Sequence, residues 1–302
     1  MRALNPKEMG AMALNSEVLQ YYLEHGPMTE LTARRDMVAG IPKDIPTIVT
    51  YVQNILLHQH WSGAYGVELS PERQREPMLR SFQEKLDFLA EHGFSHVADR
   101  KPSAEKMVGI CRDFSVVGAA LCREAGIPAR ARCGFATYFE PGTYMDHWVL
   151  EYWNYEQQRW VMVDAQLDEL QQKALQISFD PLDVGPEHFL TGPRAWMLCR
   201  QGQADPNRFG IFHWWGYDYL NCNLILDVNS LVKMPMQPWD GWPGYKSRPA
   251  AQWTEADFEF LDKLAALALA VDEDFAAFSS FVLGHEQVRV PADLSQVFNL
   301  ND

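Results

Sequence analysis

The stretch that decides the fold is residues 109–115, Gly-Ile-Cys-Arg-Asp-Phe-Ser, in which Cys111 stands where a loop gives way to a helix. We expect this helix to cover 111–125, because Gly-Ile-Pro at 126–128 stops it. A thiol in the first turn of a helix feels the partial positive charge of unpaired backbone N–H groups, which favours the thiolate. This position makes Cys111 a candidate nucleophile.

One face of this helix carries apolar and small residues, which lets it approach a sheet closely: Phe114, Gly118, Leu121, Cys122 and Ala125. Three segments downstream, 129–139, 147–154 and 159–165, have the aromatic and β-branched residues and the two-residue alternation of strands. The sequence therefore predicts one helix packed on an antiparallel sheet.

The last two strands carry His147 and Asp164, and the length of the loop between them decides whether these side chains share a face. A four-residue loop, 155–158, pairs Asn154 with Arg159 and places Asp164 opposite Val149. His147 is then diagonal to Asp164, at a Cα separation of about 7–8 Å that the two side chains can bridge. A three-residue loop would put them on opposite faces.

Three charged neighbours of these residues are interpreted as structural. Asp146 precedes His147 on a strand and points the other way, so we expect it to be solvated or to begin the strand. Arg112 and Asp113 either pair with each other or stabilise the first helical turn, where an acidic residue is favourable.

Helical patterns flank this centre, which makes the fold class α+β. Helices are predicted over 7–24, 44–60 and 72–92 on one side and over 187–201 and 254–271 on the other, with an irregular or mixed region at 209–249. Lys85 lies on an otherwise apolar stripe of the third helix, interpreted as core packing. We expect a single domain, 1–302, with a catalytic core at about 72–170, an N-terminal helical part at about 1–71 and a helical, aromatic C-terminal extension at about 171–302.

Composition excludes several classes of partner. The 302 residues contain 26 Lys and Arg against 40 Asp and Glu, and the net charge of −14 disfavours nucleic acids and anionic membranes. No apolar run has the length of a signal peptide or a membrane span, so a cytoplasmic location is expected. The five cysteines form no Cys-x-x-Cys pair and are expected to be reduced thiols.

A metal site or a bound cofactor is not expected. His58 and His60 are the only histidine pair with ligand-like spacing, and two residues apart on a helix they would diverge. The predicted helix over 44–60 therefore argues against a shared ion.

Three blocks of the sequence resemble the transglutaminase-like superfamily, cysteine enzymes with a papain-like fold. They are residues 109–130 with Cys111, residues 146–151 with His147, and residues 159–164 with Asp164. Further stretches, at 132–139, 164–168, 189–200 and 205–210, resemble a bacterial branch of that superfamily whose substrate is unassigned. The resemblance implies a catalytic triad of Cys111, His147 and Asp164.

Two features of transglutaminases are missing from this sequence. No upstream tryptophan is placed to stabilise the oxyanion, the nearest being Trp61, and no segment resembles a calcium loop. Calcium activation and protein cross-linking are therefore not expected.

The predicted function is acyl transfer through a thioester on Cys111, with His147 as general acid and base and Asp164 orienting the imidazole. The substrate would be a small-molecule or peptide amide. Attack by water would give an amidase, deamidase or peptidase, and attack by an amine a transferase; both stay open, as does the oligomeric state. A catalytically inactive binding or scaffolding protein is the alternative, and a zinc hydrolase comes third. Aromatic residues between Phe209 and Trp242 either line an acyl-binding cleft or pack an irregular segment.

Overall fold

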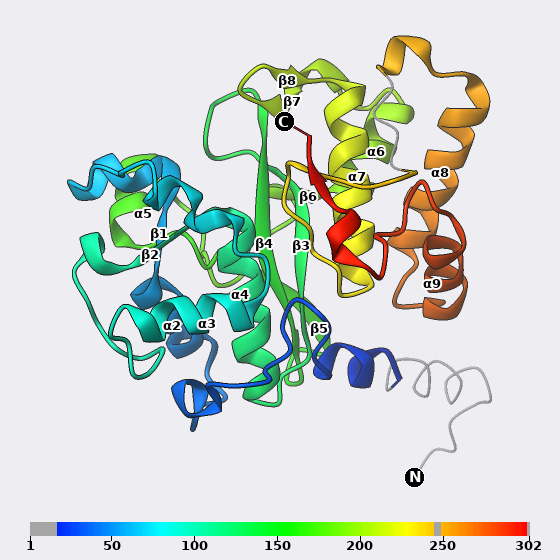
Figure 1. Cartoon of the computed structure of the whole chain (residues 1–302). Helices are drawn as coiled ribbons and strands as arrows, with labels where there is room; N and C mark the ends of the chain where they lie inside the picture. The colour runs from blue at the N-terminus through cyan, green and yellow to red at the C-terminus, as the bar shows by residue number, and fades with distance from the viewer. Residues whose placement is uncertain (1–16, 245–248, 301–302) are drawn as a thin grey trace.

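The computed structural model describes residues 17–244 and 249–300. A central sheet and one buried helix are flanked by helices on both sides: α2 and α3 on the left in Figure 1, and α6 to α9 on the right. This arrangement of helices around a largely antiparallel sheet confirms the α+β class. Among the described residues, no helix combines the length and apolar character needed to cross a bilayer.

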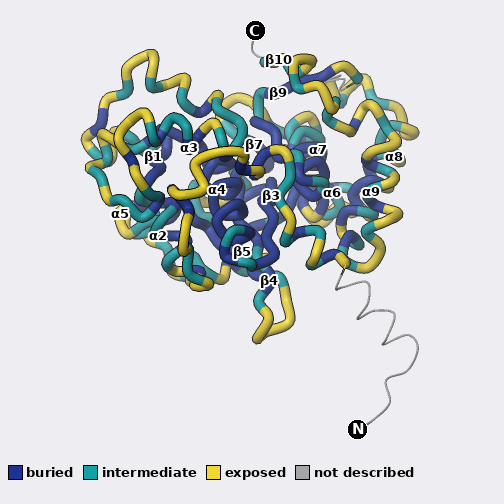
Figure 2. Tube along the Cα trace, turned by 60° about the horizontal axis from the view of Figure 1, so that its bottom comes forward, coloured by how far each residue is buried: buried dark blue, intermediate teal, exposed yellow. Residues whose placement is uncertain are grey.

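The buried helix is α4 (Cys111–Glu124), as predicted from the sequence. It packs on strands β3 (Ala129–Ala136) and β4 (Tyr144–Asn154). A Cβ atom at Gly118 would lie 3.1 Å from Leu150 Cδ2, so glycine is what permits the close approach to the sheet. All residues of α4 from 111 to 123 are buried, and the darkest part of the trace in Figure 2 follows this helix and its strands. Helix α4 is therefore covered on every side, which one apolar face did not predict.

The main sheet has the order β6-β3-β4-β7-β8, with β5 (Arg159–Val163) also paired to β4. Strands β6 (Phe189–Thr191), β7 (Phe209–Ile211) and β8 (Trp214–Trp215) are short, and only the β4–β7 pairing is parallel. Strand β7 pairs with β4 at residues 144–145 and β5 pairs with it at 150–154. Residues 146–149 of β4 are therefore not paired with either strand along this edge.

The register of the β4–β5 hairpin is the one expected from a four-residue loop. Asn154 pairs with Arg159 and Leu150 with Val163, so Asp164 follows opposite Val149. The predicted register is confirmed, and it places His147 and Asp164 on one face of the sheet.

The N-terminal part is less helical than predicted. Helix α2 is Ile45–Ile55, capped by Asp44, and the chain then forms strand β1 (Leu56–His58) and a 3-10 segment, η2 (Gln59–Tyr65). The predicted helix over 44–60 is wrong in its last five residues, because β1 pairs in parallel with β2 (Met107–Gly109) and this pairing outweighs local helix propensity.

The predicted helix over 72–92 is also wrong in its first half. Residues Arg73–Met78 form a 3-10 segment, η3, and helix α3 begins only at Phe82 and ends at Glu91. Pro77 lacks an N–H and disfavours a helical residue before it, and Ser81 forms a capping box with Glu84 that starts the helix anew. The first predicted helix, 7–24, lies partly outside the described residues, and residues 17–23 are helical.

The C-terminal part contains more helix than predicted. Helix α8 (Glu255–Leu269) was predicted. The segment predicted as one helix over 187–201 instead contains strand β6 followed by helix α6 (Gly192–Arg200). Three helices were not predicted: α5 (Glu169–Leu175), α7 (Tyr217–Leu231) and α9 (Phe275–Gly284). Helix α7 was missed because it buries polar residues, such as Asn223 and Asp227, that interrupt its apolar pattern. The remaining segments are β9 (Asp240–Gly241), β10 (Phe298–Asn299), η1 (Arg35–Val38), η4 (Ser103–Glu105), η5 (Pro206–Arg208), η6 (Ala250–Gln252) and η7 (Leu294–Gln296).

Candidate active site

Cys111 is the first residue of α4 and is 8% exposed. Burial raises the pKa of its thiol well above the ordinary value, and the carboxyl group of Asp146 raises it further, although the backbone N–H groups of Trp148 and Arg112 lower it. The resting thiol is therefore protonated, and the helix N-terminus does not by itself produce the thiolate expected from the sequence. The Trp148 contact places the sulfur beside β4, one residue from His147.

His147 and Asp164 are brought together as predicted. His147 Nε2 lies 2.8 Å from Asp164 Oδ2, and the two residues are 2% and 1% exposed. Burial raises the pKa of Asp164, but the charge of His147 and the hydrogen bonds from His147, Tyr138 and the Gln166 N–H outweigh it and lower the pKa below its usual value. Asp164 is thus a buried carboxylate.

This contact also assigns the two ring nitrogens of His147. Since a carboxylate only accepts hydrogen bonds, the nitrogen facing Asp164 carries the proton, and we assign this proton to Nε2. The other nitrogen, Nδ1, then has a free lone pair in the neutral ring. Nδ1 is the atom that can take a proton from a neighbouring thiol.

Tyr138 is a member of this group that sequence reasoning did not assign. Its hydroxyl donates to Asp164 Oδ2 at 2.6 Å, so one oxygen accepts from both Tyr138 and His147, while Oδ1 accepts from the Gln166 N–H at 3.0 Å. Proximity to Cys111 contributes to raising the pKa of Tyr138, after burial and Asp164. The only signal in the sequence was its place in a stretch that resembles the bacterial branch.

Asp146 is the third residue of β4 and is 7% exposed, so it lies near the start of a strand but is not solvated, the other alternative that the sequence left open. It does point away from the face of His147, and the side chains of Asn223 and Tyr219 contact its carboxyl group. Its Oδ1 has no hydrogen-bond partner among the described residues. Burial raises the pKa of Asp146 to about 6, so the charge that opposes a Cys111 thiolate appears near that pH.

Asp146 gives the first testable prediction, for stability. The pKa of Asp146 is 3.8 when the group is exposed and about 6 in the folded protein. The folded protein therefore has its full free energy of unfolding below pH 3.8, where the carboxyl is neutral in both states, and loses part of it as the pH rises through 6. Relative to wild type, Asp146→Asn should gain about 2 kcal/mol of unfolding free energy between pH 4 and pH 8. Urea unfolding at both pH values measures this. The exposed turn variant Glu156→Gln is the control, and an equal pH dependence of wild type and Asp146→Asn would contradict the prediction.

The segment 58–65 lies against the site although it is far upstream in the sequence. His58 pairs with Gly109 in the parallel β1–β2 ladder, and its electrostatic neighbours include His147, Asp113 and Asp164. Burial, followed by the nearby His60 and His147, lowers the pKa of His58 to about 3, so the ring is neutral. Its Nδ1 accepts the His60 N–H at 3.3 Å, which leaves the proton on Nε2.

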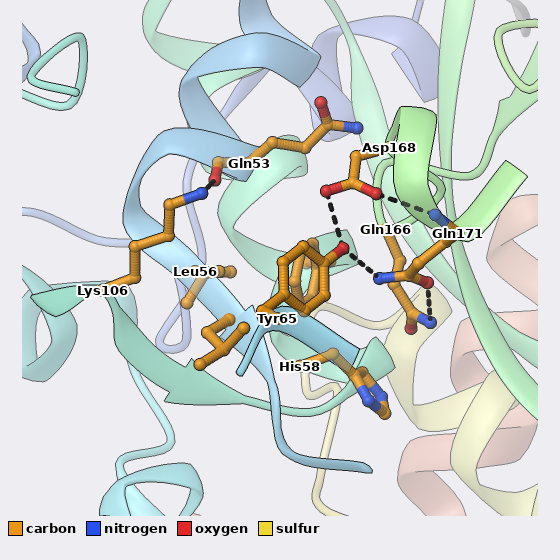
Figure 3. Close-up of a pocket in the computed structure, with 10 residues that line it drawn as sticks. Gln53, Leu56, His58, Tyr65, Lys106, Gln166, Asp168 and Gln171 are labelled. Atoms are coloured by element: carbon orange, nitrogen blue, oxygen red, sulfur yellow. Dashed lines mark hydrogen bonds between the residues drawn. The ribbon is translucent and has the colours of Figure 1, made fainter. Parts of the chain in front are cut away.

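A hydrogen-bond network fixes this segment to the chain that follows Asp164 (Figure 3). The Tyr65 hydroxyl donates to Asp168 Oδ2 at 2.6 Å and accepts from Gln171 Nε2 at 3.2 Å, and Gln166 Nε2 donates to Gln171 Oε1 at 2.9 Å. The cavity that these residues line has about 10 Å³ of free space, which suits about one water. A cavity of this size is too small for a substrate. The hydrogen bonds around it instead hold the segment 58–65 against the chain that follows Asp164.

The described residues contain no group of three or more His, Cys, Asp and Glu side chains that could hold a metal ion. His58 ends strand β1 and His60 lies in the 3-10 segment η2, so the two do not share the α-helix that was expected to separate them. Their ring centroids are 5.7 Å apart. Trp61 is in η2, three residues beyond His58.

Residues 79–165 match the family model of the transglutaminase-like superfamily. This segment, which begins before α3 and ends just after Asp164, is a transglutaminase-like core of the kind found in cysteine enzymes, and the resemblance seen in the sequence is confirmed. No curated protein sequence matches the chain.

Among solved structures, the chain is similar to a provisionally assigned cysteine protease from Cytophaga hutchinsonii, with 18% sequence identity and a TM-score of 0.24. The similarity covers 54% of this chain and 43% of the other, so the chain spans less than half the length of that protein.

Proposed function

We propose that the protein is a cysteine-dependent acyl-transfer enzyme in which Cys111 is the nucleophile, His147 the general acid and base, and Asp164 its orienting carboxylate. The observation that carries this proposal is the buried His147–Asp164 hydrogen bond of 2.8 Å. The residue after His147 on β4, Trp148, contacts the Cys111 thiol through its backbone N–H. The family match of residues 79–165 to a superfamily of cysteine enzymes supports it.

The reaction follows from the protonation states. The thiol of Cys111 is protonated at rest, so its proton passes to His147 Nδ1 while the sulfur attacks the carbonyl carbon of an amide or related acyl group. The carbonyl electrons move to oxygen and then return to expel the amine, which takes the proton from His147. A thioester on Cys111 remains, and water or an amine attacks it with His147 now acting as base.

Two N–H groups are available to stabilise the oxyanion in this scheme. The first is the backbone N–H of Cys111, which as a first-turn group has no partner within the helix. The second is Nε2–H of His58, for which no hydrogen bond exists within the described part of the chain. A neutral imidazole held by burial donates without itself losing a proton, and removal of one oxyanion donor typically costs about 100- to 1000-fold in rate.

The same proposal covers the organisation of the chain. A single domain with a catalytic core at about 72–170 is supported by contacts from the core to the C-terminal part. The Arg112 guanidinium donates to Pro235 O, at 3.0 Å from Nε, and Arg80 pairs with Asp240 at 2.6 Å. Tyr22, in the N-terminal part, donates its hydroxyl hydrogen bond to Leu231 O at 2.9 Å. The substrate would be a small-molecule or peptide amide.

The experiment that tests the proposal is capture of the acyl-enzyme. The protein is mixed with p-nitrophenyl acetate, quenched in acid and analysed by peptide mass spectrometry. We expect one acetyl group on Cys111, removed by neutral hydroxylamine as a thioester is. Acetylation confined to lysines, or spread equally over the five cysteines, would support an inactive binding protein instead.

Tyr138→Phe is expected to shift the pH dependence of this acylation. Without the Tyr138 hydroxyl, Asp164 Oδ2 accepts only the hydrogen bond from His147, so this bond becomes stronger. The stronger bond stabilises the imidazolium form of His147. The acid limb of the rate profile should therefore move to higher pH by about half a unit to one unit. The burst rate of p-nitrophenolate between pH 5 and pH 9 measures the shift. Tyr155→Phe, in the exposed turn, is the control, and a uniform loss of rate without a shift would assign Tyr138 a structural role only.

A further inference from the structure

The hairpin formed by β7 and β8 exposes aromatic side chains at its tip. Phe212 is 65% exposed and Trp214 is 52% exposed, whereas Phe209 and Trp242 of the same aromatic region are fully buried. The region therefore divides into a packing part and an exposed part. Only the exposed part is available to a ligand.

Phe212 also has a backbone conformation that disfavours it. Its φ is +53°, in the left-handed region where a bulky residue is strained, and the Trp215 indole N–H holds its carbonyl at 2.8 Å. Glycine or asparagine would suit this position better. An exposed ring and a strained backbone at the same residue both disfavour folding, and such costs gather at functional sites.

The hairpin tip lies beside the proposed catalytic group. Gly210 pairs with Met145 in the parallel β4–β7 ladder, two residues before His147 on β4, and Phe212 is the first residue after β7. On its other side the Phe212 ring meets the His60 ring at a centroid distance of 5.3 Å. His60 is in turn 5.7 Å from His58, whose electrostatic neighbours are His147 and Asp164. Phe212 therefore borders the edge of β4 from which Trp148 contacts the Cys111 thiol.

We infer that Phe212 and Trp214 form a subsite for an aromatic group carried by the substrate next to the carbonyl that Cys111 attacks. The inference rests on the proposed function. Aromatic rings gain from edge-to-face or offset contact with other rings, by about 2- to 12-fold in affinity for each pair. Contact with both rings would accordingly favour an aromatic substrate by about tenfold or more over a small aliphatic one.

The test compares two alkylating reagents that differ only in the ring, iodoacetamide and N-benzyl-iodoacetamide, on the intact protein. Rates at Cys111 are followed by mass spectrometry, with glutathione giving the intrinsic ratio of the two reagents. In wild type we expect the benzyl reagent to be favoured about tenfold over that ratio. In Phe212→Gly the ratio should fall by several fold toward that of glutathione, because only Trp214 then remains.

Phe212→Gly is suited to this test because glycine adopts the same φ without strain. The relief of strain and the greater freedom of the unfolded chain oppose each other, so the midpoint of thermal unfolding should change little. Tyr155→Ser, which removes another exposed ring at the far end of β4, is the matched control and should keep the wild-type ratio.

The outcomes separate the two proposals. A wild-type ratio equal to that of glutathione, or a ratio unchanged in Phe212→Gly, would overturn the subsite even if Cys111 reacts readily. An iodoacetamide rate that is unaffected by His147→Ala would instead contradict the proposed function.

Discussion

Replacing Asp113 by alanine should destabilise the protein by about 3–5 kcal/mol, the largest loss of stability that we expect from one substitution. Its Oδ1 lies 2.9 Å from Lys85 Nζ and 3.1 Å from Arg112 Nη1, and all three side chains are fully buried. Its Oδ2 accepts the Ile110 N–H at 2.9 Å and so caps α4. The substitution leaves two buried cations without their anion and helix α4 without its cap.

Equilibrium unfolding in urea measures this loss, and a surface ion pair provides the comparison. Asp87 pairs with Arg34 at 3.0 Å, but both side chains are 44% exposed, so Asp87→Ala should cost less than about 1 kcal/mol. Equal stabilities of Asp113→Ala and Asp87→Ala would show that the buried network does not hold the start of α4.

His147→Ala should reduce the rate of Cys111 acylation by about 1000-fold or more. The substitution removes the base that takes the thiol proton, and burial keeps that proton on sulfur because it raises the pKa of Cys111. It also leaves Asp164 with two donors, Tyr138 and the Gln166 N–H, in place of three. The measurement is the burst of p-nitrophenolate from p-nitrophenyl acetate at a pH near 8.

The control for this prediction is an exposed histidine on another element. His92 caps the end of α3 and is stacked on Phe88, so His92→Ala should leave the burst unchanged. A burst in His147→Ala that is within a few fold of wild type would remove His147 from the mechanism.

The sequence predicted those parts of the site that depend on local periodicity. The end of the helix that begins at Cys111 follows from Gly-Ile-Pro at 126–128. The hairpin register follows from the four-residue loop, because side chains alternate strictly along a strand. Arg112 and Asp113 pair with each other, and Asp113 also caps the first turn, so both expected alternatives hold.

The parts that depend on long-range contacts were not predicted. The pairing of β1 with β2, 50 or so residues apart, ended helix α2 early and brought His58 to the site. Tyr138 reaches Asp164 across 26 residues. No property of either segment by itself encodes such a contact, since it requires the sheet to be formed first.

Burial was the other source of error. Asp146 was expected to be solvated, but it is 7% exposed, and burial raises its pKa because it disfavours the charged form. Helix α7 was missed for the same reason, because Asp227 and Asn223 face β3, where Asp227 accepts the Cys133 N–H at 2.8 Å and Asn223 accepts the Cys133 thiol.

The central claim is that Cys111 forms a covalent thioester with the help of His147. Its most direct test is the position and amount of acetyl group on the protein after a brief reaction with p-nitrophenyl acetate. The account predicts close to one acetyl group per chain, on Cys111, sensitive to hydroxylamine and formed far more slowly in His147→Ala. A protein that releases p-nitrophenolate without acetylating Cys111, or that acetylates it equally fast in the variant, would contradict the account.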